Sequence, residues 1–351
     1  MPEKVIESFQ VKRLDILDER GDVDESLMPP LSDKEITKMY ELLVLSRTYD
    51  HYALSLQREG RLGTFPSILG QEASQIGSAF AVEKTDWVFP SFREMGVYIT
   101  LGYPMHMLFQ YWIGDERGFR IPDELNIFPL CVPVGTQIPH AVGAAMAAKY
   151  RGDKIAVISY FGDGGTSEGD FHEGFNIAGV FKLPVVFICQ NNQWAISVPR
   201  EKQTAAKTLA QKAFAYGFEG IQVDGNDVFA VYKATKEALE KAKKGNGPSF
   251  IECFTYRMSD HTTADDASRY RPKEEMEAWK QRDPILRLKL FMEKKGLWTE
   301  QYQKEVEEKS KTLAGDTIKT AESTDPPNPR DMFIYTNGTL SQRQLRQMEG
   351  F

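Results

Sequence analysis

The chain has 351 residues, 41% of them hydrophobic, and is therefore long enough to bury a large core. Its 43 basic and 50 acidic residues give a formal net charge of −7, which speaks against a general electrostatic attraction to nucleic acid or to an anionic membrane. No apolar run reaches transmembrane length and the N-terminus lacks the apolar core of a signal peptide, so we expect a cytoplasmic protein with no nucleic-acid and no membrane partner.

Apolar strands and helices alternate through the middle of the chain without a linker-like break. The first long helix begins at a capping box formed by Ser32 and Glu35. In chain order, we expect helices at 32–59, 70–82, 137–150, 167–180 and 228–244, and strands at 155–160, 184–189, 221–223 and 249–256. This alternation predicts an α/β fold with a doubly wound, mostly parallel sheet and with helical N- and C-terminal extensions.

The expected division of the chain is an N-terminal extension over 1–30, one α/β domain over 31–325 and a C-terminal tail over 326–351. The last boundary follows from Asp325-Pro326-Pro327-Asn328-Pro329, because clustered prolines end any preceding helix and mark a linker.

A glycine-rich segment follows the strand over 155–160. It reads Phe161-Gly162-Asp163-Gly164-Gly165-Thr166, and we expect its three glycines to allow positive φ and to let backbone N–H groups approach an anion closely. Ser167 is the expected N-cap of the next helix, whose positive dipole end then faces the turn. A P-loop is excluded because no Gly-Lys-Ser/Thr closes the turn, and a dinucleotide fingerprint fails because Ser167 replaces its third glycine.

The pair Asn191-Asn192 follows the next strand along the chain. In a right-handed strand–helix–strand unit both loops reach the same carboxyl edge of the sheet, so Asp163 and Asn192 are expected to lie together there. Mg²⁺ prefers oxygen ligands and bridges phosphate oxygens, so this carboxylate and amide predict a magnesium–diphosphate site. The alternative is a glycine-rich turn and an Asn-Asn turn that bind nothing.

Several separated segments, together with these two, carry a resemblance to a known family. The further segments are 60–63, 70–73, 92–94, 135–139, 223–227 and 260–266. From about Leu31 to Met332-Phe333, the chain resembles the alpha subunit of the thiamine diphosphate-dependent decarboxylating component of a 2-oxo acid dehydrogenase complex. The resemblance implies the thiamine diphosphate-binding fold over 31–325, with thiamine diphosphate and Mg²⁺ as cofactors.

The resemblance also implies roles for individual residues. The cofactor-binding set is Phe92, Arg93, Val134, Gly162, Asp163, Gly164, Gly165, Asn192, Trp194, Ile196 and His261. Within this set, Asp163, the side chain of Asn192 and the backbone carbonyl of Trp194 would bind magnesium, while Gly164 and Gly165 would donate backbone N–H groups to the diphosphate. Arg93 would bind the diphosphate; the alternative for it is an ordinary surface ion pair.

His261 lies in a polar loop, 257–271, that follows a strand, and by resemblance it is the expected catalytic residue. By resemblance it reaches the phosphate side of the cofactor. Ile196 would lie beneath the cofactor and force its rings into a bent conformation, although for an isolated isoleucine a core position is the default. Val134 would contact the aminopyrimidine through its backbone, and Thr136 with Gln137 resembles a potassium-binding loop.

Asp170 and Glu173 lie three residues apart on the predicted helix after the glycine turn and so share a face. By resemblance they are a possible proton relay between two active sites. The alternative is a pair of solvated acids that stabilise the helix N-terminus.

The resemblance implies that the chain is half of an enzyme. A beta subunit would supply the glutamate that activates the cofactor, in a heterotetramer of two alpha and two beta subunits, and a dihydrolipoyl acyltransferase would receive the acyl group on its lipoyl domain. Segments 63–72 and 192–197 resemble bacterial pyruvate-specific chains, so pyruvate is the expected 2-oxo acid; a branched-chain 2-oxo acid is the alternative. A cofactor-binding but catalytically silent scaffold subunit also stays open, whereas the chain is too short for a single-chain thiamine enzyme.

Overall fold

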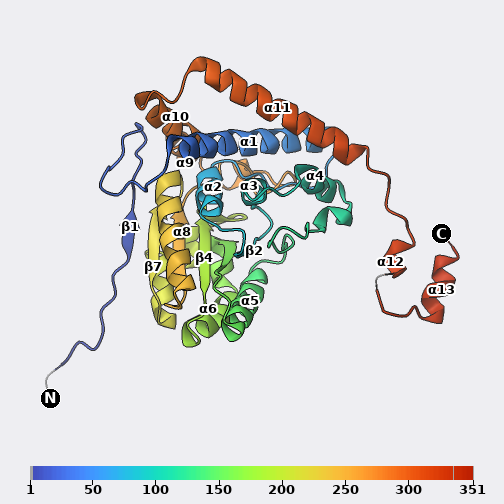
Figure 1. Ribbon diagram of the computed structural model, residues 1–351, viewed down its shortest axis with the longest axis horizontal. Helices are drawn as coiled ribbons and strands as arrows, with labels where there is room; N and C mark the ends of the chain where they lie inside the picture. Colours follow the sequence, from blue (N-terminus) through green and yellow to red (C-terminus); the bar gives the residue numbers. More distant parts are fainter. Residues whose placement is uncertain (1–2, 335, 351) are drawn as a thin grey trace.

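The computed structural model describes residues 3–334 and 336–350, and its centre is a parallel sheet with helices around it (Figure 1). Six strands form this sheet in the order β1-β7-β8-β4-β3-β2, and all neighbouring pairs are parallel. Their bounds are Lys12–Leu14 (β1), Trp87–Phe89 (β2), Val157–Gly162 (β3), Val185–Asn191 (β4), Gly220–Asp224 (β7) and Ser249–Phe254 (β8). A two-stranded antiparallel hairpin joins Trp194–Ala195 (β5) to Val198–Pro199 (β6). The predicted α/β fold with a parallel sheet is confirmed, but residues 3–30 contain no helix and instead contribute β1 to the sheet, so the expected helical character of the N-terminal extension is wrong.

Helices cover the sheet and extend beyond it. The α-helices are Asp33–Arg58 (α1), Glu72–Phe80 (α2), Met95–Thr100 (α3), Met105–Ile113 (α4), Gln137–Arg151 (α5), Gly169–Val180 (α6), Arg200–Gln203 (α7), Val228–Lys243 (α8), Lys273–Lys280 (α9), Pro284–Lys294 (α10), Glu300–Glu322 (α11), Asp331–Ile334 (α12) and Gln342–Met348 (α13). The 3₁₀ helices are Glu116–Phe119 (η1), Asp163–Ser167 (η2), Ala210–Tyr216 (η3) and Ala267–Arg269 (η4). Helix α11 lies along α1, whereas α12 and α13 lie apart from the sheet (Figure 1). Within the described ranges, no helix combines the length and the apolar character that crossing a membrane requires.

The sheet is buried on both faces, as a doubly wound sheet requires. Along β4, Val186 and Ile188 belong to a core that includes residues of α1, α2 and α8. Val185 and Phe187 point the other way, into a second core with residues of α5 and α6. Because successive side chains of a strand alternate between faces, a continuous apolar strand can fill both cores.

The strand register brings the carboxyl ends of three strands together. Gly162 of β3 is opposite Gln190 of β4, and Asn191 of β4 is opposite Phe254 of β8. The turns that leave these strands therefore start side by side at one edge, and this is the edge where parallel α/β sheets bind ligands.

Two local predictions at this edge are wrong. Ser167 is not an N-cap, because η2 occupies Asp163–Ser167 and α6 begins only at Gly169, after Glu168. Gly162, Gly164 and Gly165 do not have positive φ, since the chain leaves β3 directly into a right-handed 3₁₀ turn. Gly164 instead avoids a steric clash, because a Cβ at this position would lie 2.8 Å from the Cβ of Ala195. By contrast, the capping box of Ser32 and Glu35 at α1 is confirmed.

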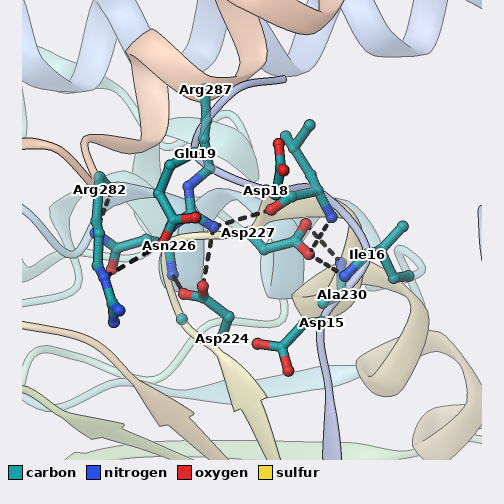
Figure 2. Close-up of polar contacts among 12 residues, drawn as sticks. Asp15, Ile16, Asp18, Glu19, Asp224, Asn226, Asp227, Ala230, Arg282 and Arg287 are labelled. Atoms are coloured by element: carbon teal, nitrogen blue, oxygen red, sulfur yellow. Dashed lines mark hydrogen bonds and ion pairs between the residues drawn. The ribbon is translucent and has the colours of Figure 1, made fainter. Parts of the chain in front are cut away.

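The segment 223–227 is a structural brace (Figure 2). The Asp227 carboxylate accepts hydrogen bonds from the backbone N–H groups of Ile16 and Leu17, at 2.6 and 2.7 Å. Arg287 of α10 binds Asp224 at 2.9 Å and donates to the Leu17 carbonyl at 3.0 Å. The brace joins the N-terminal segment, the end of β7 and the C-terminal helices, and none of these five residues lines the cavity at the sheet edge.

Candidate cofactor site

A cavity of about 600 Å³ opens at the carboxyl edge of the sheet. It gathers the whole cofactor-binding set expected from the sequence: Phe92, Arg93, Val134, Gly162, Asp163, Gly164, Gly165, Asn192, Trp194, Ile196 and His261 all line it. These residues come from segments that are up to 169 positions apart, His261 being the last and Phe92 the first. The fold therefore brings the expected residues to one place, while their individual roles stay predictions.

The expected metal ligands lie on the adjacent turns after β3 and β4. Asp163 is buried, and its Oδ2 accepts a hydrogen bond of 2.7 Å from Nε2 of Gln203. Asn192 is also buried; its Nδ2 donates to Oε1 of Gln71 at 2.9 Å, and its Oδ1 accepts from the backbone N–H of Trp194 at 3.2 Å. Burial raises the pKa of Asp163, and the nearby donors Gln203 and the Asn192 backbone oppose this rise.

A metal ion at this edge would need ligands of mixed type. Across residues 3–334 and 336–350, no group of three or more His, Cys, Asp and Glu side chains is placed to hold a metal ion. A carboxylate, an amide oxygen, a backbone carbonyl and phosphate oxygens together suit a hard divalent cation such as Mg²⁺, which uses few protein ligands. The donor set therefore fits magnesium only if a phosphate ligand is bound beside it.

Two buried guanidinium groups flank the cavity. Arg93 is 5% exposed and Arg257 is 0% exposed, and neither forms an ion pair with a carboxylate of the described chain. Burial lowers the pKa of Arg93 to about 10, with a contribution from the charge of Arg257, so Arg93 is still a cation at neutral pH. Burying a charge without a counter-charge is costly, and a bound diphosphate would supply that counter-charge. The surface ion pair considered for Arg93 is wrong.

His261 lies between these two arginines. Its Nδ1 is 3.2 Å from Nη2 of Arg93 and 3.4 Å from Nη1 of Arg257. Burial, followed by the charges of Arg93 and Arg257, lowers the pKa of His261 to about 4, so the imidazole is neutral at pH 7. Guanidinium groups only donate, so Nδ1 accepts and the proton resides on Nε2. The ring of Phe92 packs edge-on against the imidazole at a centroid distance of 6.0 Å.

The turn over 193–196 has an unusual backbone that Arg257 holds in place. Gln193 and Ile196 have φ of 72° and 54°, a left-handed conformation that is costly for a β-branched residue. Arg257 donates from Nη1 to the Trp194 carbonyl at 3.1 Å and from Nη2 to the Ile196 carbonyl at 2.8 Å. A carbonyl oxygen has two lone pairs, so the Trp194 carbonyl retains one for a metal. Ile196 is 55% exposed and lines the cavity, so the alternative of a core position is wrong.

Comparison with known proteins identifies the family to which the chain belongs. The family model described as "Dehydrogenase E1 component" matches residues 40–330. The chain belongs to this family. Curated relatives include a "Pyruvate dehydrogenase E1 component subunit alpha" of Staphylococcus aureus (strain Mu50 / ATCC 700699), 45% identical over 350 residues, which cover 99% of this chain and 95% of the relative. The proteins of the same name from Bacillus subtilis (strain 168) and Bacillus cereus are 45% and 43% identical, covering 88% and 92% of this chain and 84% and 88% of the relatives.

The dehydrogenase E1 family implies thiamine diphosphate, and buried polar atoms of the cavity fit such a ligand. Nε2 of Gln71 and Oε1 of Gln137 are buried and have no hydrogen-bond partner among the residues described. Both side chains line the cavity. Since buried polar atoms are rarely left unpaired, these two atoms indicate a polar ligand in the cavity.

Sequence reasoning missed several polar residues that line this E1 cavity or contact its lining residues. Gln71 and Glu94 belong to motifs that carried the resemblance, but nothing in the sequence shows that their side chains reach the cavity. Burial raises the pKa of Glu94 to about 7, and its Oε1 accepts a bond of 2.6 Å from Gln190. Gln203 and Arg257 contact residues that are 40 and 63 positions away, so no local pattern could have identified them.

Asp170 and Glu173 do not line the cavity. Both lie in the first turns of α6, where Glu173 is exposed and Asp170 is partly exposed. This position suits solvated acids near a helix N-terminus, and a relay would need groups from a second subunit. The relay therefore stays a prediction.

Proposed function

We propose that this chain is the alpha subunit of a pyruvate dehydrogenase E1 component. In this proposal it binds thiamine diphosphate and Mg²⁺, decarboxylates pyruvate, and passes the acetyl group to the lipoyl group of a dihydrolipoyl acyltransferase. The observation that carries the proposal is the buried guanidinium group of Arg93, which has no carboxylate partner among the described residues and lines the same cavity as Asp163 and Asn192. The names of relatives that cover nearly the whole chain support the choice of pyruvate.

The residues at the phosphate end would bind and orient the cofactor. Asp163, Asn192 and the Trp194 carbonyl would hold Mg²⁺, and Arg93 would neutralise the diphosphate. The chemistry that thiamine diphosphate supplies when bound is an acidic thiazolium carbon that adds to the 2-oxo carbon, together with an electron sink for the bond broken in decarboxylation.

Beside these residues, His261 would donate a hydrogen bond and Ile196 would shape the cavity. A neutral His261 with its proton on Nε2 is a hydrogen-bond donor for an anionic oxygen of substrate or cofactor. Ile196, exposed in the cavity on a rigid turn, would support the bent cofactor conformation that brings its amino group to the reacting carbon.

The proposal includes a beta subunit, because the chemistry needs a glutamate beside the pyrimidine ring that we assign to that partner. The expected assembly contains two alpha and two beta subunits, and the expected compartment is the cytoplasm. The proposed proton relay of Asp170 and Glu173 would operate across the contact between subunits in this assembly.

The proposal is tested by calorimetric titration of thiamine diphosphate into the purified alpha–beta assembly, with and without Mg²⁺. Binding should require the metal. Asp163→Asn should weaken metal-dependent binding by more than the roughly 10- to 100-fold loss typical of changes outside the ligand set. Binding that does not depend on Mg²⁺, or that Asp163→Asn leaves unchanged, would contradict the proposal.

Steady-state rates on the reconstituted complex separate the alternatives. A higher kcat/KM with pyruvate than with 3-methyl-2-oxobutanoate supports the pyruvate reading, and the reverse order supports a branched-chain enzyme. Metal-dependent binding with no decarboxylation of either acid would support a silent scaffold subunit.

A further inference from the structure

The two side chains among the expected metal ligands each bond a glutamine from a different segment. Asn192 donates from Nδ2 to Oε1 of Gln71, at 2.9 Å, and Asp163 accepts at Oδ2 from Nε2 of Gln203, at 2.7 Å. Gln71 immediately precedes α2, and Gln203 ends α7. Neither glutamine belongs to the ligand set that the sequence indicates.

Gln71 decides which way the Asn192 amide faces. An amide that turns by 180° exchanges its oxygen and nitrogen, and only the oxygen can bind a metal ion. In the structure Oε1 of Gln71 faces Nδ2 of Asn192, and with this bond formed Oδ1 is on the opposite side of the amide. The backbone N–H of Trp194, which donates to Oδ1 at 3.2 Å, favours the same orientation.

Gln203 fixes the rotation of the Asp163 carboxylate. Its Nε2 also donates to the Val198 carbonyl at 3.3 Å, which anchors the amide to the β5–β6 hairpin. With one carboxylate oxygen bonded to an anchored donor, the other oxygen has a defined direction. The bond also offsets part of the cost of burying the charge of Asp163.

We propose that Gln71 and Gln203 are positioning residues that set the metal-facing oxygens of Asn192 and Asp163. This inference rests on the proposed function, since it assumes that these two side chains bind Mg²⁺. Mg²⁺ demands nearly ideal octahedral geometry, whereas Ca²⁺ accepts irregular arrangements, so ligand orientation matters more for Mg²⁺. Residues that orient metal ligands typically change metal affinity by roughly 10- to 100-fold.

Gln71 has a second group that fits this position. Its Nε2 is buried without a partner among the described side chains and backbone, although the residue lines the cavity. A donor of this kind suits a metal-bound water or a phosphate oxygen. Gln71 would thus face Asn192 with one end of its amide and the bound ligand with the other.

The test compares near-isosteric substitutions in the alpha–beta assembly. Gln71→Met and Gln203→Met keep side-chain length and remove the hydrogen bond, and Gln71→Glu keeps the acceptor that faces Asn192. Gln211→Met is the matched control, because Gln211 is an exposed glutamine of η3 that does not line the cavity. Mg²⁺ and Ca²⁺ are titrated at saturating thiamine diphosphate, with emission of Trp112 and Trp194, which line the cavity, as the signal.

We expect both methionine variants to bind Mg²⁺ roughly 10- to 100-fold more weakly, with a smaller loss for Ca²⁺. Gln71→Glu should recover most of the Mg²⁺ affinity, and the control should match the unaltered protein. If Gln203→Met does not fold, Gln203→Asn, which is too short to reach Asp163, carries the same expectation.

Two results would overturn the inference while leaving the proposed function intact. One is unchanged Mg²⁺ affinity in the methionine variants. The other is an equal loss for Mg²⁺ and Ca²⁺ accompanied by a lower melting temperature of the metal-free protein, which would indicate a purely structural role. If the unaltered assembly shows no metal-dependent binding, the proposed function fails and this inference fails with it.

Discussion

His261 shows how burial and neighbouring charge decide the chemistry of a single residue. A general acid at neutral pH needs a pKa near 7, but two guanidinium groups and burial lower the pKa of His261 to about 4. The same burial raises the pKa of Glu94, in the same cavity, to about 7. The neutral imidazole of His261 therefore donates from Nε2 at pH 7, whereas the carboxyl group of Glu94 titrates near neutrality.

The pKa of Glu94 leads to a prediction about stability. The rise from 4.5 to about 7 means that the folded state binds a proton more tightly than the unfolded state, by about 3 kcal/mol. This contribution is fully present below the ordinary pKa of the carboxyl group and is lost as the pH rises through about 7. We expect the melting temperature of the cofactor-free protein to fall between about pH 5 and pH 8, and the fall to be smaller in Glu94→Gln. Equal pH dependence in the two proteins would contradict the assignment.

At the scale of elements, the sequence predicts what depends on local periodicity. The strands β3 and β4 and the helix α6 lie within about two residues of their predicted bounds. Their prediction succeeds because the spacing of apolar residues along a segment shows whether a strand or a helix can bury them. The conformation of the turn between β3 and α6 was predicted wrongly, and no local pattern shows that the turn packs close to Ala195, 31 positions beyond Gly164. Gln71 and Gln203, which bond the expected ligands, were missed because they belong to segments distant in the sequence.

The contact between this turn and the β5–β6 hairpin predicts a compensating pair of substitutions. Gly164→Ala would place a Cβ 2.8 Å from the Cβ of Ala195, so the 194–196 turn must shift. We expect Gly164→Ala to weaken thiamine diphosphate binding by calorimetry, because Trp194 and Ile196 would move with the turn. Ala195→Gly removes the contacting atom, so the double variant should recover most of the affinity. Additive losses in the double variant would show that the close approach is not the cause.

At the scale of the whole molecule, the N-terminal segment, the end of β7 and α10 meet at the brace of Figure 2. The N-terminal segment contributes β1 to the sheet edge and backbone N–H groups to Asp227, while α10 contributes Arg287. These contacts join residues up to 270 positions apart, and none of the bonded brace residues lines the cavity. This explains in physical terms how segment 223–227 can carry the resemblance without lining the site.

The brace predicts very different costs for two arginines that contact the same acid. Arg287 and Arg282 both pair with Glu19, at 3.5 and 3.3 Å, but their side chains are 1% and 41% exposed. Arg287→Met leaves Asp224 buried without its partner and should lower the free energy of unfolding by about 3–5 kcal/mol. Arg282→Met removes an exposed pair and should cost only about 0–1 kcal/mol. Urea unfolding of the two variants measures the difference, and similar costs would mean that Arg287 does not hold the N-terminal segment and α10 to β7.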